Sequence, residues 1–429
     1  MVAPAIAVEN LISGVRLSSV GPARVTGTDV IHEPTSMDLA MKLHYIRAVY
    51  YFRSSSVEGL GLYTIKEAMF RWFNLYPHTC GRFRRSDSGH PFIKCNDCGA
   101  RFIEAQCSKT LDEWLEMKEC SLHNLLVSNQ VLGPDLGFSP SILIQMTTFQ
   151  CGGVALSFSW AHVLGDAFSL SEFLYLWSQI MAGHQPPNSP LPKPETKASK
   201  SKNSSGFAVE PLSVKRVEPV GDHWIAANTG KMENYSFQIT AQQLKVMISK
   251  MFQTSQIRPF EFLSAVFWKY LARIREGSEP KTVTISRKDS HNREKGTLCN
   301  NQIINTVQAY FSVAEANPKD LVELIMEQKI DEKRKIEELV EQDGGLSDLI
   351  MYGANLTFLD LEEADLYGLE LKKEKPVFVN YTIDGVGDEG LILVMKAPSG
   401  AGSWTVTVIL PENEILKLND ELQREWSIA

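Results

Sequence analysis

Apolar positions along the chain show two kinds of periodicity, one typical of helices and one typical of strands. They recur at helical spacing in residues 64–76, 167–181 and 258–274, so each of these stretches is expected to form a helix. Near-continuous apolar runs with few charges, such as 152–160, predict buried strands. In 403–410 the side chains alternate along the run, with threonines at two of the intervening positions, which also indicates a strand.

Both periodicities occur before and after a stretch near the middle of the chain that shows neither. Residues 183–222 are rich in proline, serine and lysine and contain few large apolar side chains, so this stretch is expected to be a solvated linker. We therefore predict an N-terminal domain over 1–182 and a C-terminal domain over 223–429. Helices and strands in both halves predict an α/β, or mixed α+β, fold class.

Two stretches of the second half carry specific local predictions. The apolar spacing after Pro318 continues to Gln342, so one long helix is expected there. Asp331 and Lys335 would then pair on its wet face. GVGDEG (385–390) has the glycine spacing of a dinucleotide-binding loop, but no helix follows it, so we expect a hairpin turn between two strands.

Composition narrows the class of protein. Apolar residues make up 44% and charged residues 22% of the chain, as in ordinary globular proteins. The formal net charge of −8 argues against nucleic acid as a main partner, because phosphate binding needs concentrated positive charge. No apolar run reaches the roughly 18 residues that cross a bilayer, and the first residues do not resemble a secretory leader, so we expect no membrane anchor.

Cysteine usage favours reduced thiols over a disulfide framework, because seven is an odd number. Cys95 and Cys98 form a C-x-x-C, but no second pair with zinc-site spacing accompanies them. Cys80 and Cys107 are near in sequence and have no paired spacing. We therefore expect no metal and prefer buried thiols that act as small apolar side chains.

The candidate chemistry lies in SFSWAHVLGDAFSL (157–170), between a predicted strand and a predicted helix. His162 stands where the strand ends and Asp166 where the helix begins, with Gly165 in the connection. An aspartate there can cap the helix and faces the positive end of its dipole. His162 is either a hydrogen-bonded core histidine or a general base, and the loose H-x-x-x-D spacing alone favours the first.

HVLGD (162–166), followed by an apolar helix just before a midpoint linker, resembles the motif of the plant BAHD acyltransferases. That family moves acyl groups from coenzyme A thioesters to alcohols or amines. The resemblance runs from about residue 13 to residue 411. Longer stretches resemble its eceriferum and glossy subgroup, which serves cuticular wax synthesis: LSSVGPARVTGTDVIHEPTSMDLAMKLHYIRAVYYF, FIKCNDCG, GPDLGFSP, KRVEPVGDHW, YGANLTFLDLEEADLYGLE and VNYTIDGVGDEGLILV.

The resemblance implies two similar chloramphenicol-acetyltransferase-like domains, each a mixed sheet with flanking helices, and a channel at their interface. It implies that His162 lies in this channel and, as general base, takes the proton of an acceptor hydroxyl that attacks the thioester. Asp166 would point away and pair with an arginine, for which Arg287 in TISRKDS is the positional match. Acyl-CoA is the implied substrate, and no tightly bound cofactor is expected.

Two segments depart from the family pattern. The family's D-F-G-W-G is represented by DLYGL (365–369), in which Asp365 is the clear match, and its Y-F-G-N by TLCN (297–300). Both would lie where the second domain meets coenzyme A. Such departures mark the eceriferum subgroup, whose members act at the endoplasmic reticulum with a fatty-acid condensing enzyme, a ketoacyl-CoA synthase of the elongase complex.

Three functions stay open on the sequence. The first is an accessory factor that promotes very-long-chain fatty acid elongation for wax, cytoplasmic and held at the endoplasmic reticulum through its partner, without turnover of its own. The second is an acyl-CoA-dependent O- or N-acyltransferase with His162 as base. The third is a pseudoenzyme that binds a small metabolite. The subgroup resemblance favours the first, and a monomer is expected in each case.

Overall fold

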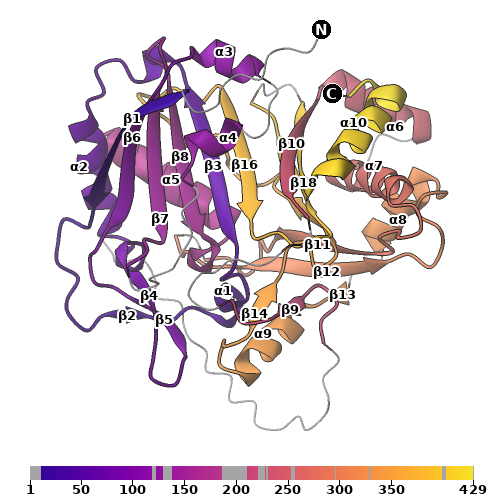
Figure 1. Ribbon diagram of the computed structural model, residues 1–429, viewed down its shortest axis with the longest axis horizontal. Coiled ribbons are helices and arrows are strands. Elements are labelled where there is room, and N and C mark those ends of the chain that lie inside the picture. The colour runs from indigo at the N-terminus through magenta and orange to yellow at the C-terminus, as the bar shows by residue number, and fades with distance from the viewer. Residues whose placement is uncertain are drawn as a thin grey trace.

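Two mixed β-sheets stand side by side, each flanked by helices (Figure 1). This confirms the mixed α/β class expected from the sequence. Most of the predicted linker lies outside the described residues, so the domain boundaries at 182 and 223 stay predictions. The computed structural model describes residues 11–117, 122–128, 138–185, 210–220, 228, 230–252, 257–294, 296–327, 330–398 and 402–428.

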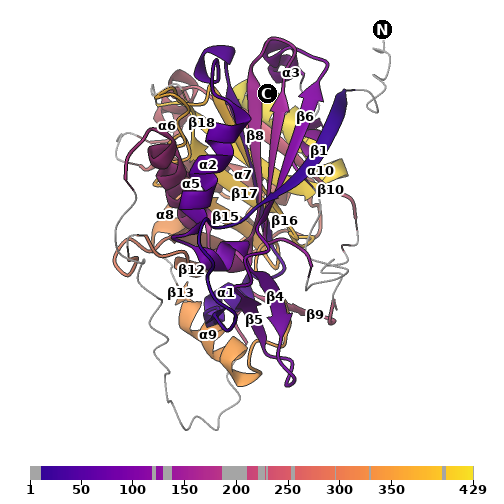
Figure 2. The ribbon, with the colours of Figure 1, turned by 90° about the vertical axis from the view of Figure 1, so that its left-hand side faces the viewer.

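The first sheet has six strands and belongs mainly to the first half of the chain. In spatial order they are β1 (Ile12–Val20), β6 (Ala100–Cys107), β7 (Ile142–Thr148), β8 (Val154–Ala161), β3 (Tyr45–Phe52) and β16 (Phe378–Asp384). Helices α2 (Leu62–Phe73) and α5 (Ala167–Met181) lie side by side on one face (Figure 2), where Trp72 and Trp177 stack with ring centroids 5.2 Å apart. Helices α3 (Leu111–Glu116) and α4 (His123–Leu126) cover a smaller core on the opposite face.

The second sheet has seven strands, and its two parallel pairs both involve its central strand. In spatial order the strands are β10 (Met232–Ile239), β18 (Trp404–Pro411), β17 (Leu391–Lys396), β15 (Leu356–Asp360), β11 (Thr282–Lys288), β12 (Gln302–Gln308) and β13 (Ile330–Asp331). The fully buried Phe237, Phe267 and Trp268 mark the core between this sheet and its helices. The helices are α6 (Ala241–Met251), α7 (Pro259–Ile274), α8 (Pro318–Glu327) and α10 (Glu412–Trp426).

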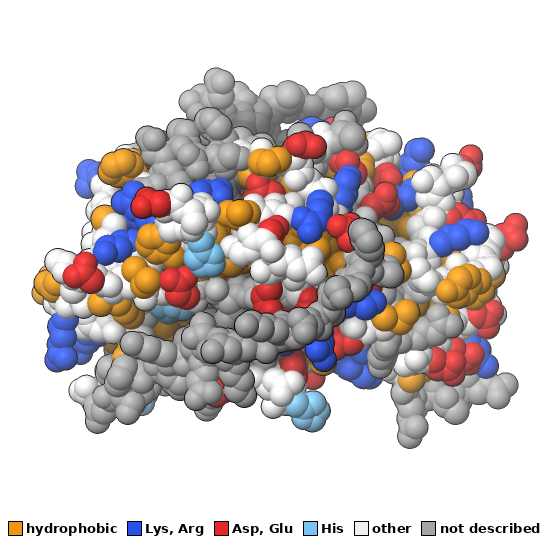
Figure 3. Space-filling view, turned by 90° about the horizontal axis from the view of Figure 1, so that it is seen from below, with side chains coloured by type: hydrophobic (Ala, Val, Ile, Leu, Met, Phe, Trp, Pro, Cys, Tyr) orange, Lys and Arg blue, Asp and Glu red, His pale blue; other side chains and the backbone are white. Residues whose placement is uncertain are grey.

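Short elements gather at the lower end of the molecule in Figure 1. On the face seen from that end, acidic and basic side chains of the described residues are interspersed (Figure 3). No helix among the described residues is both long and apolar enough to span a bilayer. The remaining elements are β2 (Ile31–His32), α1 (Ser36–Ala40), η2 (Ser54–Ser56), η3 (Pro77–Cys80), β4 (Arg82–Arg85), β5 (Pro91–Lys94), η5 (His162–Leu164), β9 (Lys215–Val217), α9 (Lys333–Gln342) and β14 (Asp348–Ile350).

The last strand of the first sheet comes from the second half of the chain. β16 pairs antiparallel with β3, with Asp384 opposite Tyr45 and Phe378 opposite Tyr51. The next strand, β17, belongs to the other sheet. Residues 385–390 therefore cross from one sheet to the other, and the predicted hairpin turn is wrong.

The predicted long helix after Pro318 is also wrong, because a strand interrupts it. α8 ends at Glu327, and β13 then pairs with the edge strand β12 before α9 begins. The Asp331 carboxylate accepts the backbone N–H of Lys333 at 3.0 Å, so it helps to start α9. The predicted pair is replaced as well, since Lys335 lies 3.9 Å from Glu332.

Candidate functional site

The connection between β8 and α5 folds as the sequence predicts, with His162 directly after the strand and Asp166 as the N-cap of the helix. Gly165 makes the turn with φ 142°. A Cβ on this residue would lie 2.8 Å from Ser169 Cβ and 3.0 Å from the backbone nitrogen of Cys299. Both the backbone angle and the lack of space therefore require glycine here.

Asp166 is fully buried and joins the two halves of the chain. Its carboxylate accepts the Ser169 N–H at 2.8 Å, which caps α5. Arg293, from the second half, donates two hydrogen bonds to the same carboxylate, both 3.0 Å long. The backbone N–H of Asn301 adds a fourth at 3.2 Å. The carboxylate thus serves as a buried clamp, in agreement with the structural role expected for Asp166.

The arginine that pairs with Asp166 is Arg293, and the sequence-based choice of Arg287 is wrong. Arg287 lies within β11 and faces α7, where its guanidinium is 3.0 Å from Glu261 and 4.8 Å from the centre of the Phe260 ring. Arg293 lies beyond the end of that strand, in the connection to β12. Pairing of distant chain segments, which motif position does not encode, decides between the two.

Asn300 fixes the backbone of His162, a role that the sequence did not reveal. Its side-chain N–H groups donate to the His162 carbonyl oxygen at 2.7 Å and to Asp38 Oδ1 at 2.8 Å. Asp38 is buried, and this burial raises the pKa of its carboxyl. Asn300 is the last residue of TLCN, so the asparagine of the family's Y-F-G-N was the available signal.

The His162 ring lies at the seam between the halves, and its side chain is 0% exposed. Burial lowers the pKa of this imidazole to about 4, so the ring is neutral at pH 7. Its Nε2 is 3.2 Å from the hydroxyl of Tyr352, which comes from the second half. The Tyr352 hydroxyl also donates to Gln302 Oε1 at 3.0 Å, and that oxygen accepts the Ser286 hydroxyl at 2.7 Å.

The single proton of the Tyr352 hydroxyl limits what His162 can do in this arrangement. When the hydroxyl donates to Gln302, the imidazole must carry its own proton on Nε2 and cannot accept another there. When the hydroxyl donates to Nε2 instead, it fills the position of an acceptor alcohol. In both cases the nitrogen that a general base would use is occupied, and solvent does not reach it.

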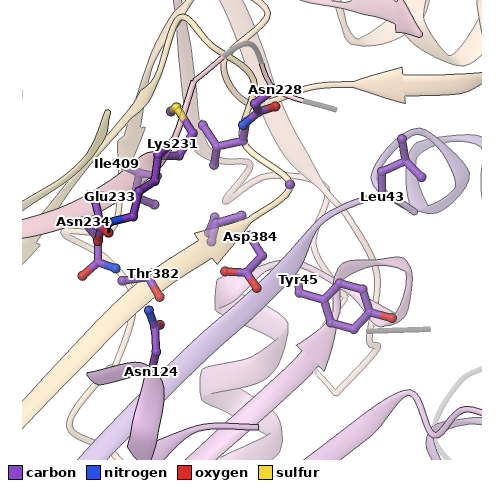
Figure 4. A pocket seen from close by; sticks show the side chains of 14 residues that line it. Leu43, Tyr45, Asn124, Asn228, Lys231, Glu233, Asn234, Thr382, Asp384 and Ile409 are labelled. Carbon is purple, nitrogen blue, oxygen red and sulfur yellow. Dashed lines mark hydrogen bonds and ion pairs between the residues drawn. The ribbon is translucent and has the colours of Figure 1, made fainter. Parts of the chain in front are cut away.

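A cavity of about 430 Å³ lies beyond His44, and neither His162 nor Tyr352 is among its described lining residues. It lies between β16 and β10, and Figure 4 shows Asp384 and Thr382 on one side and Lys231 and Glu233 on the other. Gly385 also lines it, and a Cβ there would lie 3.3 Å from Nδ1 of His44. The buried His44 ring lies 5.0 Å from the Tyr352 ring and 6.3 Å from the His162 ring, measured between centroids. The His44 ring therefore stands between Gly385 of the cavity lining and the rings of Tyr352 and His162.

The remaining candidates lie away from His162. Asp365 is exposed, and its segment reaches the C-terminal end of α5, where the Ser178 hydroxyl is 3.4 Å from the Gly368 carbonyl oxygen. Asp166 caps the opposite end of the same helix, so the structure does not bring Asp365 and His162 together. Cys95 is buried and Cys98 exposed. The described residues contain no group of three or more His, Cys, Asp or Glu side chains that could hold a metal ion.

Comparison with known sequences identifies the relatives of this chain. The model of the protein family described as "Transferase family" matches residues 34–424 of this chain. Protein ECERIFERUM 26 of Arabidopsis thaliana is 41% identical and covers 97% of both chains. Protein ECERIFERUM 2 of the same plant is 38% identical over 96% of this chain and 98% of its own. A hydroxycinnamoyltransferase of Narcissus pseudonarcissus is 21% identical over 89% of this chain and 93% of its own.

Solved structures share the fold at low sequence identity. Vinorine synthase superposes with a TM-score of 0.74 at 14% identity, over 96% of this chain and 98% of its own. TRI101 of F. sporotrichioides, in complex with coenzyme A and T-2, gives a TM-score of 0.69 at 14% identity, over 93% and 98%. The sequence matches and this fold agree with the resemblance found from the motifs. The chain belongs to the Transferase family, that of the BAHD acyltransferases, and within it to the group of the ECERIFERUM proteins.

Proposed function

We propose that this protein promotes the elongation of very-long-chain fatty acyl groups for cuticular wax, together with a condensing enzyme of the ketoacyl-CoA synthase type, and without an acyl transfer of its own. Its kinship with the ECERIFERUM proteins supports the pathway. Their similarity extends over nearly the whole chain, so it includes both halves and the seam between them.

The burial of His162 and the contact of its Nε2 with Tyr352 support the absence of turnover. A general base must come within about 2.6–3.2 Å of the proton that it takes. The group at that distance here is the protein's own Tyr352 hydroxyl, at 3.2 Å, and the imidazole is 0% exposed. Under this proposal His162 is a core histidine that links the halves.

Yeast that expresses a plant condensing enzyme provides the test, with the chain lengths of its fatty acyl groups as the readout. Wild type should shift the distribution to longer chains, and His162→Ala should do so to the same extent. His162→Gln keeps a hydrogen-bonding group beside Tyr352 and serves if the alanine variant does not fold. A folded His162 variant that no longer extends the chains would contradict the proposal.

A working acyltransferase is the second candidate, and the neutral imidazole beside a hydroxyl favours it. Nε2 would take the proton of an acceptor alcohol or amine as the acceptor attacks the thioester carbonyl. The C–S bond would then break, and the imidazolium would return the proton to the leaving thiolate of coenzyme A. This route requires Tyr352 to leave Nε2, so that the acceptor can take its place.

The purified protein distinguishes the two candidates. Incubation with an acyl-CoA and a panel of alcohols and amines should release no coenzyme A under the first proposal. Under the second, release should occur and fall by about 10²–10⁴-fold in His162→Ala. Tyr352→Ala, which clears the space beside Nε2, should raise the rate in the second case and leave it at zero in the first.

The remaining parts of the proposal concern partners and place. We infer a cytoplasmic monomer that associates with the endoplasmic reticulum through the condensing enzyme, meets acyl-CoA there and holds no cofactor tightly. A pull-down with tagged protein should recover the condensing enzyme. Its absence from the pull-down, together with a bound small molecule of another class, would favour a pseudoenzyme of unrelated purpose.

A further inference from the structure

A second cavity, which we name the apolar cleft, lies between the halves on the far side of β3 from α5. Its volume is about 560 Å³, within the range of small-molecule sites of about 300–1,000 Å³. The first half contributes α3 and α4, and the second half contributes β10, the start of β16, and Ala397, Pro398 and Ser403 (Figure 1). Its main apolar side chains are Trp114, Met117, Tyr235, Ile239, Val377 and Phe378.

The described part of the apolar cleft's lining is uncharged. None of the described lining residues is Asp, Glu, Lys or Arg. His123 also lines the cleft, and its Nδ1 is 2.9 Å from the Tyr51 hydroxyl. Burial lowers the pKa of His123 to about 4, so it is neutral at pH 7. The cleft therefore complements an uncharged, apolar ligand segment and disfavours a charged one.

The polar cavity of Figure 4 continues the apolar cleft along the same two strands. The cavities share Asn234; the polar one is lined by the start of β10 and the end of β16, and the apolar one by the end of β10 and the start of β16. The polar cavity contains Lys231, Glu233 and Asp384. An apolar compartment followed by a charged and hydrogen-bonding one is the complement of an amphiphile.

The length of the apolar cleft suits a long alkyl chain. Along β10 it reaches from Asn234 to Thr240. Six residue steps at about 3.3 Å each give roughly 20 Å. Carbon–carbon bonds of about 1.5 Å in a zigzag advance about 1.25 Å each, so some sixteen methylenes span that distance.

We propose that the apolar cleft binds the unbranched alkyl chain of a long acyl group, whose polar head lies in the neighbouring polar cavity. This inference rests on the proposed function and names the ligand class that the protein holds during elongation. Each methylene transferred from water to an apolar site contributes about 0.8 kcal/mol, so affinity should rise about fourfold per methylene while the chain still fits.

Direct binding to the purified full-length protein tests this, by calorimetry below the micellar concentration of each ligand. Octadecanoyl-CoA and octadecanoic acid form two arms that distinguish a thioester from a free acid as the source of the chain. Binding in one arm or both supports the proposal, with the eight-carbon analogue at least about 100-fold weaker. Equal affinity for the eight- and eighteen-carbon ligands, or no binding in either arm, would overturn it.

A matched pair of variants assigns the binding to the cleft. Leu115 lines the cleft and is 36% exposed, so Leu115→Asp should fold and place a carboxylate in the path of the chain. We expect it to weaken octadecanoyl-CoA binding by at least about tenfold. Leu416→Asp, at a 67% exposed position on α10, is the control and should bind as wild type. Wild-type affinity in Leu115→Asp would refute the assignment to this cleft.

The two proposals fail in different ways. Elongation in yeast without measurable chain binding would overturn the cleft inference and leave the proposed function standing. Chain binding that depends on Leu115, without any effect on elongation, would overturn the proposed function and leave the cleft as an acyl-chain site.

Discussion

Replacing Asp166 by alanine removes the buried carboxylate that joins α5 to the second half of the chain. Its partner is Arg293 in the structure, whereas motif position pointed to Arg287. A double-mutant cycle separates these assignments, because coupling between two substitutions reports a direct interaction. The cycle combines Asp166→Ala with Arg293→Met, and a parallel cycle combines it with Arg287→Met.

The expected loss of unfolding free energy follows from the burial of the Asp166–Arg293 pair. The side chains of Arg293 and Asp166 are 4% and 0% exposed, so the value for a buried pair applies. Removing one partner of such a pair costs about 3–5 kcal/mol, because the other charge stays buried. Without Asp166, the carboxylate that the described residues leave to Arg293 is that of the half-exposed Glu172, whose Oε1 is 3.5 Å from its Nε. Asp166→Ala also loses the cap on Ser169 N–H, worth about 1 kcal/mol, which gives a total of about 4–6 kcal/mol.

The double variant should cost much less than the sum of the single ones, since it leaves no unpaired charge. We expect a coupling energy of about 3 kcal/mol between Asp166 and Arg293. Arg287→Met should destabilise the protein through its own contact with Glu261 and couple to Asp166 by less than about 0.5 kcal/mol.

Urea unfolding followed by tryptophan fluorescence provides the free energies, because the chain has eight tryptophans, including the fully buried Trp160 and Trp177. The slope of the unfolding free energy against urea concentration must be the same among the variants for the comparison to hold. Additive effects of Asp166→Ala and Arg293→Met, or strong coupling with Arg287→Met, would refute the described clamp.

Three further predictions concern the same site. Gly165→Ala should lower the free energy of unfolding by about 1–3 kcal/mol, whereas Gly183→Ala, where a Cβ meets no atom within 4 Å, should cost less; equal losses in urea midpoints would contradict the crowding at Gly165. Between pH 6.5 and about 4 the unfolded chain protonates His162 and the folded protein does not, so His162 alone should contribute a loss of about 3 kcal/mol to the fall in stability as the pH drops, and His162→Gln should lose less than wild type by that amount; parallel pH profiles of the two proteins would argue against this. Diethyl pyrocarbonate should leave His162 unmodified in the wild type and label it in Tyr352→Ala, as read by mass spectrometry; rapid labelling of the wild type would show that the ring is accessible.

Local patterns in the sequence predicted the strand, turn and helix around His162 because each depends on neighbouring residues. The apolar run of β8, the capping carboxylate of Asp166 and the amphipathic α5 are all encoded within about thirty residues. The backbone angle of Gly165 is equally local, since it comes from the turn itself, whereas its crowding against Cys299 is not.

The contacts that define the site depend on segments far apart in the sequence, and no local pattern contains them. Tyr352 is 190 positions from His162, and nothing in its surroundings marks it as the group that would occupy Nε2. Arg293 differs from Arg287 only by lying beyond the end of β11, which is decided by where that strand stops pairing. β13 was hidden within a helical pattern for the same reason, because its pairing with β12 outweighs local helix propensity.

Strand β16, which the second half of the chain contributes to the first sheet, makes the two halves dependent on each other. Without it, β3 would become an open edge of eight residues, all of them buried in the intact protein. Such an edge is a template for strand addition by other chains. If the polypeptide is cut between the halves, the N-terminal fragment alone should therefore be insoluble. Co-expression of both fragments should restore its solubility, because β16 can then pair with β3 as in donor-strand complementation.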